Sequence, residues 1–294
     1  MSVRLFGRWS RLVVGNLELK PDKAGETLKY TFTVSKNLQG APNTAEIAVY
    51  NLNREHRAQI EQIKTNETKG LKIKTVPVSL EAGYGLDSEG GPAGKDASLI
   101  FLGHLRSFLT TREGPDLVTN IGTGDGEVNI RRARVALSFA PGVPTDTAFR
   151  QLAEAVGVDR GNLDDAVKTL KGKAIFPMGT VFSGSASREL DAVCRSLGLE
   201  WSVQNGKLQI LLRGQALKEK AILLNKDSGM LGEPTIDTQG VMGVSMLMAP
   251  DVYPGRKMVV QGERLRGQYR IEETSHKGDT MGGEWAIEIK GRRY

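Results

Sequence analysis

Residues 188–212 constrain the fold more than any other stretch, because they predict one amphipathic helix that leads directly into one β-hairpin. Gly198 follows the helical apolar pattern, and glycine tolerates the left-handed backbone that ends many helices. Asn205-Gly206 then favours a two-residue type I′ turn between two alternating strands. The apolar positions are Leu190, Val193, Cys194, Leu197, Leu199, Trp201, Val203, Leu208, Ile210 and Leu212. A helix and hairpin in direct succession are therefore predicted.

Strand patterns dominate the chain on both sides of this region. Apolar and polar residues alternate over residues 30–35 and again through Ile47 and Val49, after which Asn53 can cap a short helix. Residues 84–97 are rich in Gly and Ser and are expected to be a loop insertion. Further strands are expected at residues 76–80, 99–105, 107–112, 117–121, 221–224, 241–248, 257–261, 268–275 and 284–290. The methionines at positions 242, 246 and 248 are expected in the core of this mainly β chain.

Two internal similarities suggest how these parts are organised. Residues 149–158 repeat the apolar pattern of residues 190–199, which predicts two similar helices in the middle of the chain. In the strand-rich parts, Gly114-Pro115 and Gly282-Gly283 each separate a long strand from a final alternating strand. The same type of β-barrel is therefore expected before and after the helical region.

The predicted fold class is mainly β with a small α+β insert. Two antiparallel tube-like β-barrels are expected, one in residues 1–136 and one in residues 214–294. A middle domain of two helices and a hairpin, residues 137–213, is expected between them. A chain of 294 residues is long enough for each of these domains to bury its own core.

Composition limits the location and redox chemistry of the chain. No apolar run approaches the roughly 18 residues of a membrane-spanning helix, and Arg4, Arg8 and Arg11 interrupt any signal-peptide core. The single cysteine, Cys194, excludes an internal disulfide, and its place in the apolar pattern favours a buried side chain over a nucleophile. We therefore expect no membrane insertion.

The net charge of +6 and the pI near 9.3 raise the possibility of nucleic-acid binding, which depends on where the charge lies. Basic residues are spread over the whole chain, and the one local basic cluster is Arg131, Arg132 and Arg134. A strand or turn edge that presents these side chains to solvent or to a partner's carboxylates is favoured over a phosphate site.

The sequence carries none of the common motifs that combine a nucleophile with its base, bind a metal or cradle a phosphate. The histidines, His56, His104 and His276, are scattered. The glycine-rich run Gly122–Gly126 is similar to a phosphate loop, but no helix is expected after it, so a turn between strands is favoured.

Two acidic pairs are candidate sites. The neighbouring side chains of Glu272 and Glu273 would point to opposite faces of a strand, which disfavours shared acid–base chemistry. Asp164 and Asp165 lie between the predicted helices, where a helix N-terminus favours acids, and metal binding there is the weaker hypothesis. We therefore predict no catalytic, cofactor-binding or metal site, and no enzyme.

Five segments carry a resemblance to a known family. They are residues 29–52, the paired helices at 149–158 and 190–199, the hairpin within 198–208, and the terminal run 283–289. In this order they resemble the baseplate hub proteins of contractile-tailed phages, which are related to the late control protein D family and to the hub portion of type VI secretion spike proteins. The resemblance covers nearly the whole chain, but each motif is a fold pattern rather than a chemical signature.

The resemblance implies a structural virion protein in the tail baseplate, assembled in the host cytoplasm as a homotrimer. Three copies with two barrels each would form a pseudo-sixfold ring that joins the hexameric tail tube to the trimeric central spike. The implied partners are the tail tube protein, the central spike protein, the tape-measure protein and other baseplate proteins, with DNA only in transit through the lumen. Because the chain has no spike repeat at its C-terminal end, the spike is expected to be a separate polypeptide, and lysozyme activity is not expected.

Other interpretations stay open. In the same class, the chain could be a tail-tip or distal-tail component of a non-contractile phage, or part of a phage-derived injection device. In a different class, it could be a β-rich module that binds nucleic acid or cell-wall glycan. A cell-wall hydrolase is disfavoured by the lack of a catalytic constellation.

Overall fold

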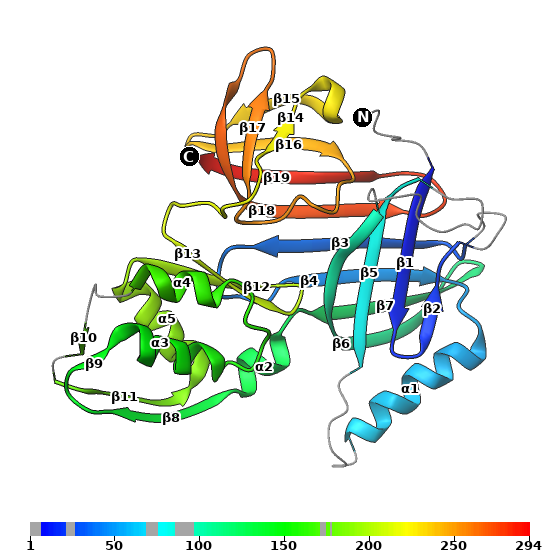
Figure 1. Cartoon of the computed structure of the whole chain (residues 1–294). Helices are drawn as coiled ribbons and strands as arrows, with labels where there is room; N and C mark the ends of the chain where they lie inside the picture. Colours follow the sequence, from blue (N-terminus) through cyan, green and yellow to red (C-terminus); the bar gives the residue numbers. More distant parts are fainter. Residues whose placement is uncertain (1–6, 22–26, 69–75, 86–96, 171–174, 177) are drawn as a thin grey trace.

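The computed structural model describes residues 7–21, 27–68, 76–85, 97–170, 175–176 and 178–294. Of the loop predicted at residues 84–97, residues 86–96 lie outside the described part of the chain. The described chain is mainly strand, as predicted, with a helical lobe beside the main sheet (Figure 1).

Most of the strands in the described residues belong to one 13-stranded sheet. Its main path runs β15-β16-β19-β18-β3-β4-β7-β6-β5-β1-β2, and β17 pairs with both β18 and β14. The strands are β1 (Arg8–Val14), β2 (Leu17–Leu19), β3 (Tyr30–Asn37), β4 (Thr44–Tyr50), β5 (Pro77–Tyr84), β6 (Ala97–Glu113), β7 (Asp116–Gly124), β14 (Ile222–Leu224), β15 (Met230–Ile236), β16 (Val241–Leu247), β17 (Lys257–Gln261), β18 (Arg266–Asp279) and β19 (Trp285–Arg293). Outside this sheet, α1 (Arg54–Thr68) and the short 3₁₀ helix η1 (Lys226–Ser228) complete the strand-rich parts.

The first and last parts of the chain meet where β18 pairs antiparallel with β3. The pairing extends from Glu273 opposite Asn37 to Asp279 opposite Thr31. One apolar core runs through both parts and includes the buried methionines 242, 246 and 248, which confirms their predicted place. The strands of the first and last parts thus form one shared sheet. Closure of each part into its own barrel, and the domain limits at 136 and 213, stay predictions.

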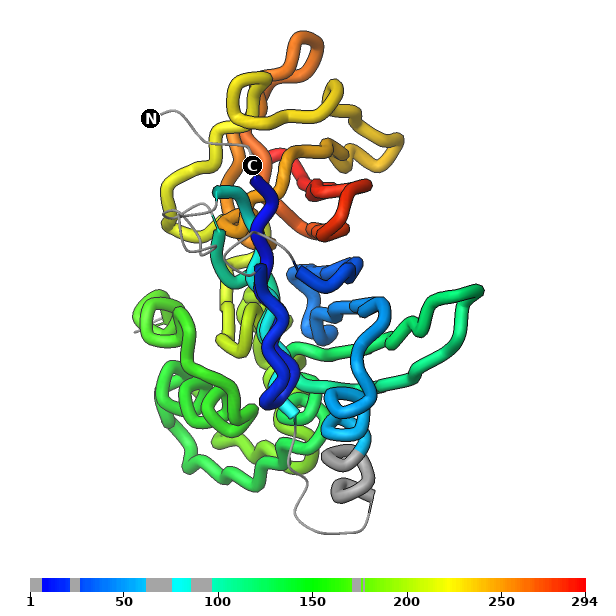
Figure 2. The backbone as a smooth tube through the Cα atoms, turned by 90° about the vertical axis from the view of Figure 1, so that its right-hand side faces the viewer, coloured from blue at the N-terminus to red at the C-terminus, as the bar shows by residue number. Residues whose placement is uncertain are grey.

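Long hairpins occur in both parts, as the sequence similarity suggested. The strands predicted at residues 99–105 and 107–112 are one strand, β6, in which the register with β7 shifts between Leu105 and Ser107. A bulge of this kind adds a residue without ending the strand, so the predicted break was wrong. Figure 2 shows the β6–β7 hairpin projecting from the body of the molecule, with its turn at Gly114 and Pro115.

The helical lobe has a core of its own, separate from that of the main sheet. Its elements are α2 (Glu127–Arg132), β8 (Arg134–Phe139), β9 (Val143–Pro144), α3 (Thr145–Glu154), α4 (Leu163–Leu170), β10 (Ile175–Phe176), β11 (Thr180–Ser185), α5 (Ala186–Ser196), β12 (Leu199–Gln204) and β13 (Lys207–Leu212). The two predicted helices correspond to α3 and α5. The prediction of a two-helix lobe was wrong, because α2, α4 and two short strand pairs also belong to it.

The missed helix α4 has its own sequence signal. Leu163, Ala166, Val167 and Leu170 fall at i, i+3, i+4 and i+7, and all four are buried. The acidic pair at 164–165, expected between the two predicted helices, occupies the first turn of this helix, where acids are favourable.

The predicted helix and hairpin at residues 188–212 are confirmed with one exception. Gly198 has φ +66° after α5, and the turn residues Asn205 and Gly206 have φ values of +52° and +77°. The apolar residues of α5 and of both strands pack into the lobe core, whereas Leu212 is 41% exposed at the end of β13. The alternation therefore predicts the apolar face correctly up to the last residue of the hairpin, whereas its polar face, with Ser202, Gln204 and Gln209, is buried as well.

Candidate functional site

The β12–β13 hairpin lies between the helical lobe and the main sheet (Figure 1). Strand side chains point alternately to opposite faces, and one face of the hairpin supplies Val203, Leu208 and Ile210 to the lobe core. The polar residues Gln204 and Gln209 are also buried. Their side chains bind the main sheet and the loop before β17, so this hairpin is the junction that joins lobe and sheet.

The turn of the hairpin is held by one buried carboxylate. Asp125 Oδ2 accepts a hydrogen bond from the Asn205 backbone N–H at 2.7 Å, and its Oδ1 accepts one from Gly206 N–H at 2.8 Å. Asp125 is fully buried, and burial raises the pKa of its carboxyl group. The two backbone N–H groups and the positive charge of Lys36 act against that rise by favouring the ionised form.

A buried lysine approaches the same turn from β3. Lys36 Nζ donates a hydrogen bond to Asn205 Oδ1 at 2.8 Å, and only 3% of the residue is exposed. Burial lowers the pKa of Lys36 to about 8, against an opposing effect of Asp125. We call Lys36, Asp125 and Asn205 the junction cluster. Its members come from β3, from the β7–α2 connection and from the hairpin turn.

Amide groups extend the contact along β12. Asn43 Nδ2 donates to the Val203 carbonyl at 2.7 Å and to Gln204 Oε1 at 3.0 Å, and Gln204 Nε2 donates to the Asn37 carbonyl at 2.8 Å. A Cβ atom at Gly40 would lie 3.0 Å from a ring carbon of Trp201, so the backbone approaches this indole closely. Burying amides without partners is costly, and these mutual bonds remove that penalty.

The last part of the chain binds the hairpin through a buried arginine. Arg270 on β18 forms ion pairs with Glu200 on β12 and, at 2.6 Å, with Glu272. Its guanidinium also donates to the Gln215 carbonyl at 3.1 Å. Burial raises the pKa of Glu200, and the charge of Arg270 acts against this rise. Glu273 instead pairs with Lys290 at 3.0 Å, so the two neighbouring glutamates have different partners.

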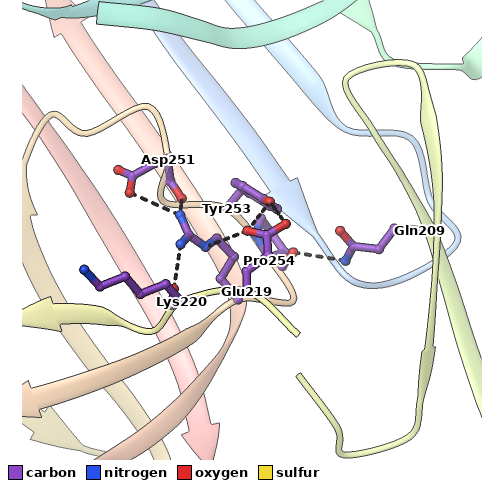
Figure 3. Close-up of polar contacts among 7 residues, drawn as sticks. Gln209, Glu219, Lys220, Asp251, Tyr253 and Pro254 are labelled. Atoms are coloured by element: carbon purple, nitrogen blue, oxygen red, sulfur yellow. Dashed lines mark hydrogen bonds and ion pairs between the residues drawn. The ribbon is translucent and has the colours of Figure 1, made fainter. Parts of the chain in front are cut away.

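A second arginine organises the loop before β17 (Figure 3). Arg256 pairs with Glu219 and with Asp251, each at 3.1 Å, and donates to the Lys220 carbonyl at 2.7 Å. The Tyr253 hydroxyl donates to Glu219 at 2.7 Å, and the Arg256 guanidinium lies 5.5 Å from the centre of the Tyr253 ring. The arginine therefore fixes this loop beside the hairpin.

The loop is joined to the hairpin by one further bond. Gln209 Nε2 on β13 donates to the Pro254 carbonyl at 3.0 Å, as Figure 3 shows. The hairpin thus contacts both strand-rich parts of the chain, the first through the junction cluster and the last through Arg270 and Gln209.

Several residues singled out in the sequence have structural partners instead of a shared site. The expectation that no helix follows Gly122–Gly126 was wrong, because α2 begins at Glu127. Of the basic cluster, Arg131 pairs with Glu127 at 2.9 Å and Arg134 donates to backbone carbonyls of its own turn. These arginines do not converge on a common centre in the described structure.

The remaining candidates are also engaged separately. Asp164 pairs with Arg150 at 2.5 Å, and Asp165 pairs with Lys168 at 2.9 Å. Among the described residues, no group of three or more His, Cys, Asp or Glu side chains is arranged to hold a metal ion. Cys194 is buried, and burial raises the pKa of its thiol to about 12. His276 is buried on β18, His56 lies in α1 and His104 in β6.

Comparison with known proteins decides between the classes left open by the sequence. The family model described as Baseplate hub gp41 matches residues 13–269. The chain belongs to the baseplate hub gp41 family. This hub protein is therefore a structural component of the phage tail baseplate and of the virion, and not an enzyme.

Solved structures show the same fold at low sequence identity. The hub protein is similar to the 43 kDa tail protein of prophage MuSo2 from Shewanella oneidensis, with TM-score 0.61, 8% identity and 98% of each chain covered. It is similar to a tail protein from Neisseria meningitidis MC58, with TM-score 0.59, 8% identity, and 98% of this chain and 97% of that chain covered. No curated protein sequence matches it.

A third structure extends the similarity beyond phage tails. The E. coli c3393 protein is described as a component of the type VI secretion system, with structural similarity to the T4 tail proteins gp27 and gp5. It matches with TM-score 0.57 and 10% identity, over 96% of this hub protein and 76% of the E. coli chain.

Within the described residues of the hub protein, no helix is both long and apolar enough to span a membrane.

Proposed function

We propose that this hub protein is a trimeric symmetry adapter that joins the hexameric tail tube to the trimeric central spike. The observation that carries the proposal is the pairing of β18 with β3, which places the two strand-rich parts of one chain side by side in a continuous sheet. Each part contributes a long hairpin, β6–β7 or β18–β19. A trimer of such chains presents six related units, and six are needed to face a hexameric tube.

The charge on the central strands supports a channel through which DNA passes without being held. On the face of β18 and β19 that points away from the core, Lys277 pairs with Glu288 at 2.7 Å and Lys290 pairs with Glu273 at 3.0 Å. Tight DNA binding depends on basic groups that neutralise successive phosphates. Basic groups already paired with carboxylates bind phosphates weakly, so we assign this face to the lumen.

The proposed partners are those of a hub: the tail tube protein, the central spike protein, the tape-measure protein and the neighbouring baseplate proteins. The family match supports these assignments, since a baseplate hub lies among such components. The E. coli structure, described as part of the type VI secretion system, supports an assembly role for the shared fold.

Sedimentation equilibrium of the purified chain tests the proposal, with and without its spike protein. The expected particle contains three copies of the 32.0 kDa chain, either alone or together with the bound spike. A strictly monomeric particle under both conditions would contradict the adapter role. If that monomer also bound oligonucleotides with a steep salt dependence, nucleic-acid binding would replace the adapter role as the proposed function.

A further inference from the structure

The junction cluster places a buried amine and a buried carboxyl group beside the primary amide of Asn205. Lys36 Nζ lies 2.8 Å from Asn205 Oδ1, and Asp125 binds the two backbone N–H groups of the same turn. Lys36 is 3% exposed and Asp125 is fully buried. A hydrogen bond alone would not require a lysine here, since its charge is costly to bury. The combination therefore calls for a chemical explanation.

We propose that Lys36 and Asn205 form an intramolecular isopeptide bond, with Asp125 as the positioning residue. The bond would covalently join β3 of the main sheet to the hairpin of the helical lobe. It goes beyond the adapter function and does not depend on it.

The reaction is an amide exchange that needs no oxidant and no cofactor. The neutral amine of Lys36 attacks Cγ of Asn205 and forms the Nζ–Cγ bond. The Cγ–Nδ2 bond then breaks, one proton moves from Nζ to the departing nitrogen, and ammonia leaves. The products are one secondary amide and one ammonia molecule, so atoms and charge balance.

The geometry favours this attack. Oδ1 is bonded directly to Cγ, so rotation of the amide about χ2 breaks the present hydrogen bond and turns the face of Cγ towards Nζ, which is the face that the amine must attack. The Asp125 carboxylate accepts hydrogen bonds from the backbone N–H groups of Asn205 and Gly206 at 2.7 and 2.8 Å. These bonds fix the position of Asn205, whose Cγ is the electrophile, relative to β3. Holding two reacting groups in contact replaces a slow bimolecular encounter by a step within one molecule.

The surroundings supply a route for the leaving group. Lys36, Gln204 and Asn205 line a cleft of about 490 Å³, and Asn205 is partly exposed. Ammonia formed at Asn205 can therefore reach solvent, whereas Lys36 stays shielded. Loss of ammonia to bulk water makes the reaction effectively irreversible.

The charges around Lys36 determine when its amine is neutral. Burial lowers the pKa of Lys36 to about 8, and the negative charge of Asp125 acts against this decrease. The buried His276 stays uncharged near neutral pH, because burial lowers its pKa to about 3. On the neighbouring strands, Glu273 is paired with Lys290, and on the hairpin Lys207 is exposed. Bond formation is therefore expected to become faster as the pH rises from about 6 to about 9.

Peptide mapping of the purified full chain, after incubation near pH 8.5, tests the proposal directly. The expected product is a branched peptide joining residues 36 and 205, with the intact mass lowered by about 17 Da through loss of ammonia. Full recovery of Lys36 and Asn205 in separate linear peptides would overturn the proposal. So would the same mass loss confined to a linear peptide, because that identifies a succinimide at Asn205-Gly206, or a gain of about 1 Da, which identifies deamidation.

Matched variants separate the chemistry from folding. Lys36→Arg keeps the positive charge without a nucleophilic amine, and Asn205→Gly removes the amide while tolerating the φ of +52°. Both are expected to abolish the branched peptide. Lys207→Arg, on an exposed lysine of the same hairpin, is expected to retain it. A branched peptide that persists in Lys36→Arg would contradict the assignment of the nucleophile.

Asp125→Asn tests the positioning residue through the pH profile. The negative charge of Asp125 raises the pKa of Lys36, whereas burial lowers it. Without that charge the pKa of Lys36 is lower, so the pH at which half the maximal rate is reached is expected to fall. The rate maximum itself is expected to fall as well, because Asn binds the turn less strongly. An unchanged profile and rate would exclude Asp125 from this role.

Discussion

At the scale of single residues, the part of the protein that matters most for its architecture is a set of buried polar side chains. Lys36, Asp125 and Arg270 are buried and bind the hairpin from both strand-rich parts. Their partners lie far away along the chain, so no local pattern predicts them. By contrast, the burial of Cys194 was predictable, because it follows from helical periodicity alone.

Acid stability depends on His276. Its pKa is lowered to about 3 by burial, while the unfolded chain binds the proton at about pH 6.5. Between these values the unfolded state holds more protons, so stability is lost as the pH falls. From pH 6 to pH 5 this histidine is expected to account for a loss of roughly 1 kcal/mol in the free energy of unfolding.

Urea unfolding of the wild type and of His276→Gln at both pH values measures this effect. The variant is expected to be less stable at pH 6 but to lose less stability on acidification. Equal losses in the two proteins would show that His276 is not the group that titrates.

At the scale of elements, residues 188–212 remain the best-defined local structure, and the fold now explains why they matter. The helix α5 packs in the lobe core, and the hairpin connects the lobe to both strand-rich parts. Short-range signals were sufficient to predict this unit, because a glycine at the helix end and an Asn-Gly turn determine the backbone locally. The helix α4 was missed although its apolar spacing is present in the sequence.

Gly198 gives a test of that local geometry. A Cβ atom there would have nothing within 4 Å, so the penalty of Gly198→Val arises from the backbone φ of +66° rather than from a clash. The variant is expected to lose about 2 kcal/mol of stability and to assemble less well. Differential scanning calorimetry and sedimentation of the variant measure both effects.

The matched control is Gly282→Val. A Cβ atom at Gly282 also meets nothing within 4 Å, but this residue does not have a left-handed φ. The control is expected to unfold at nearly the wild-type temperature. If both variants lost equal stability, the left-handed end of α5 would not be the cause.

At the scale of the whole molecule, the sequence predicted two similar strand-rich parts but not how they meet. The pairing of β18 with β3 brings together residues more than 230 positions apart, and one core runs through both parts. Hydrophobic alternation predicts that a strand has a buried face, but it does not select the partner strand. The continuous sheet is therefore a property of the assembled chain, and it supports the adapter function we propose.

Electron microscopy of intact tails carrying a tagged copy of this chain tests the central proposal most directly. The expected image shows a ring with three copies of the chain between the end of the tail tube and the spike. Its lumen is expected to be lined by the face of β18 and β19 that carries the Lys277–Glu288 pair. A tag found away from the tube–spike junction, or a ring with a different number of copies, would contradict the proposal.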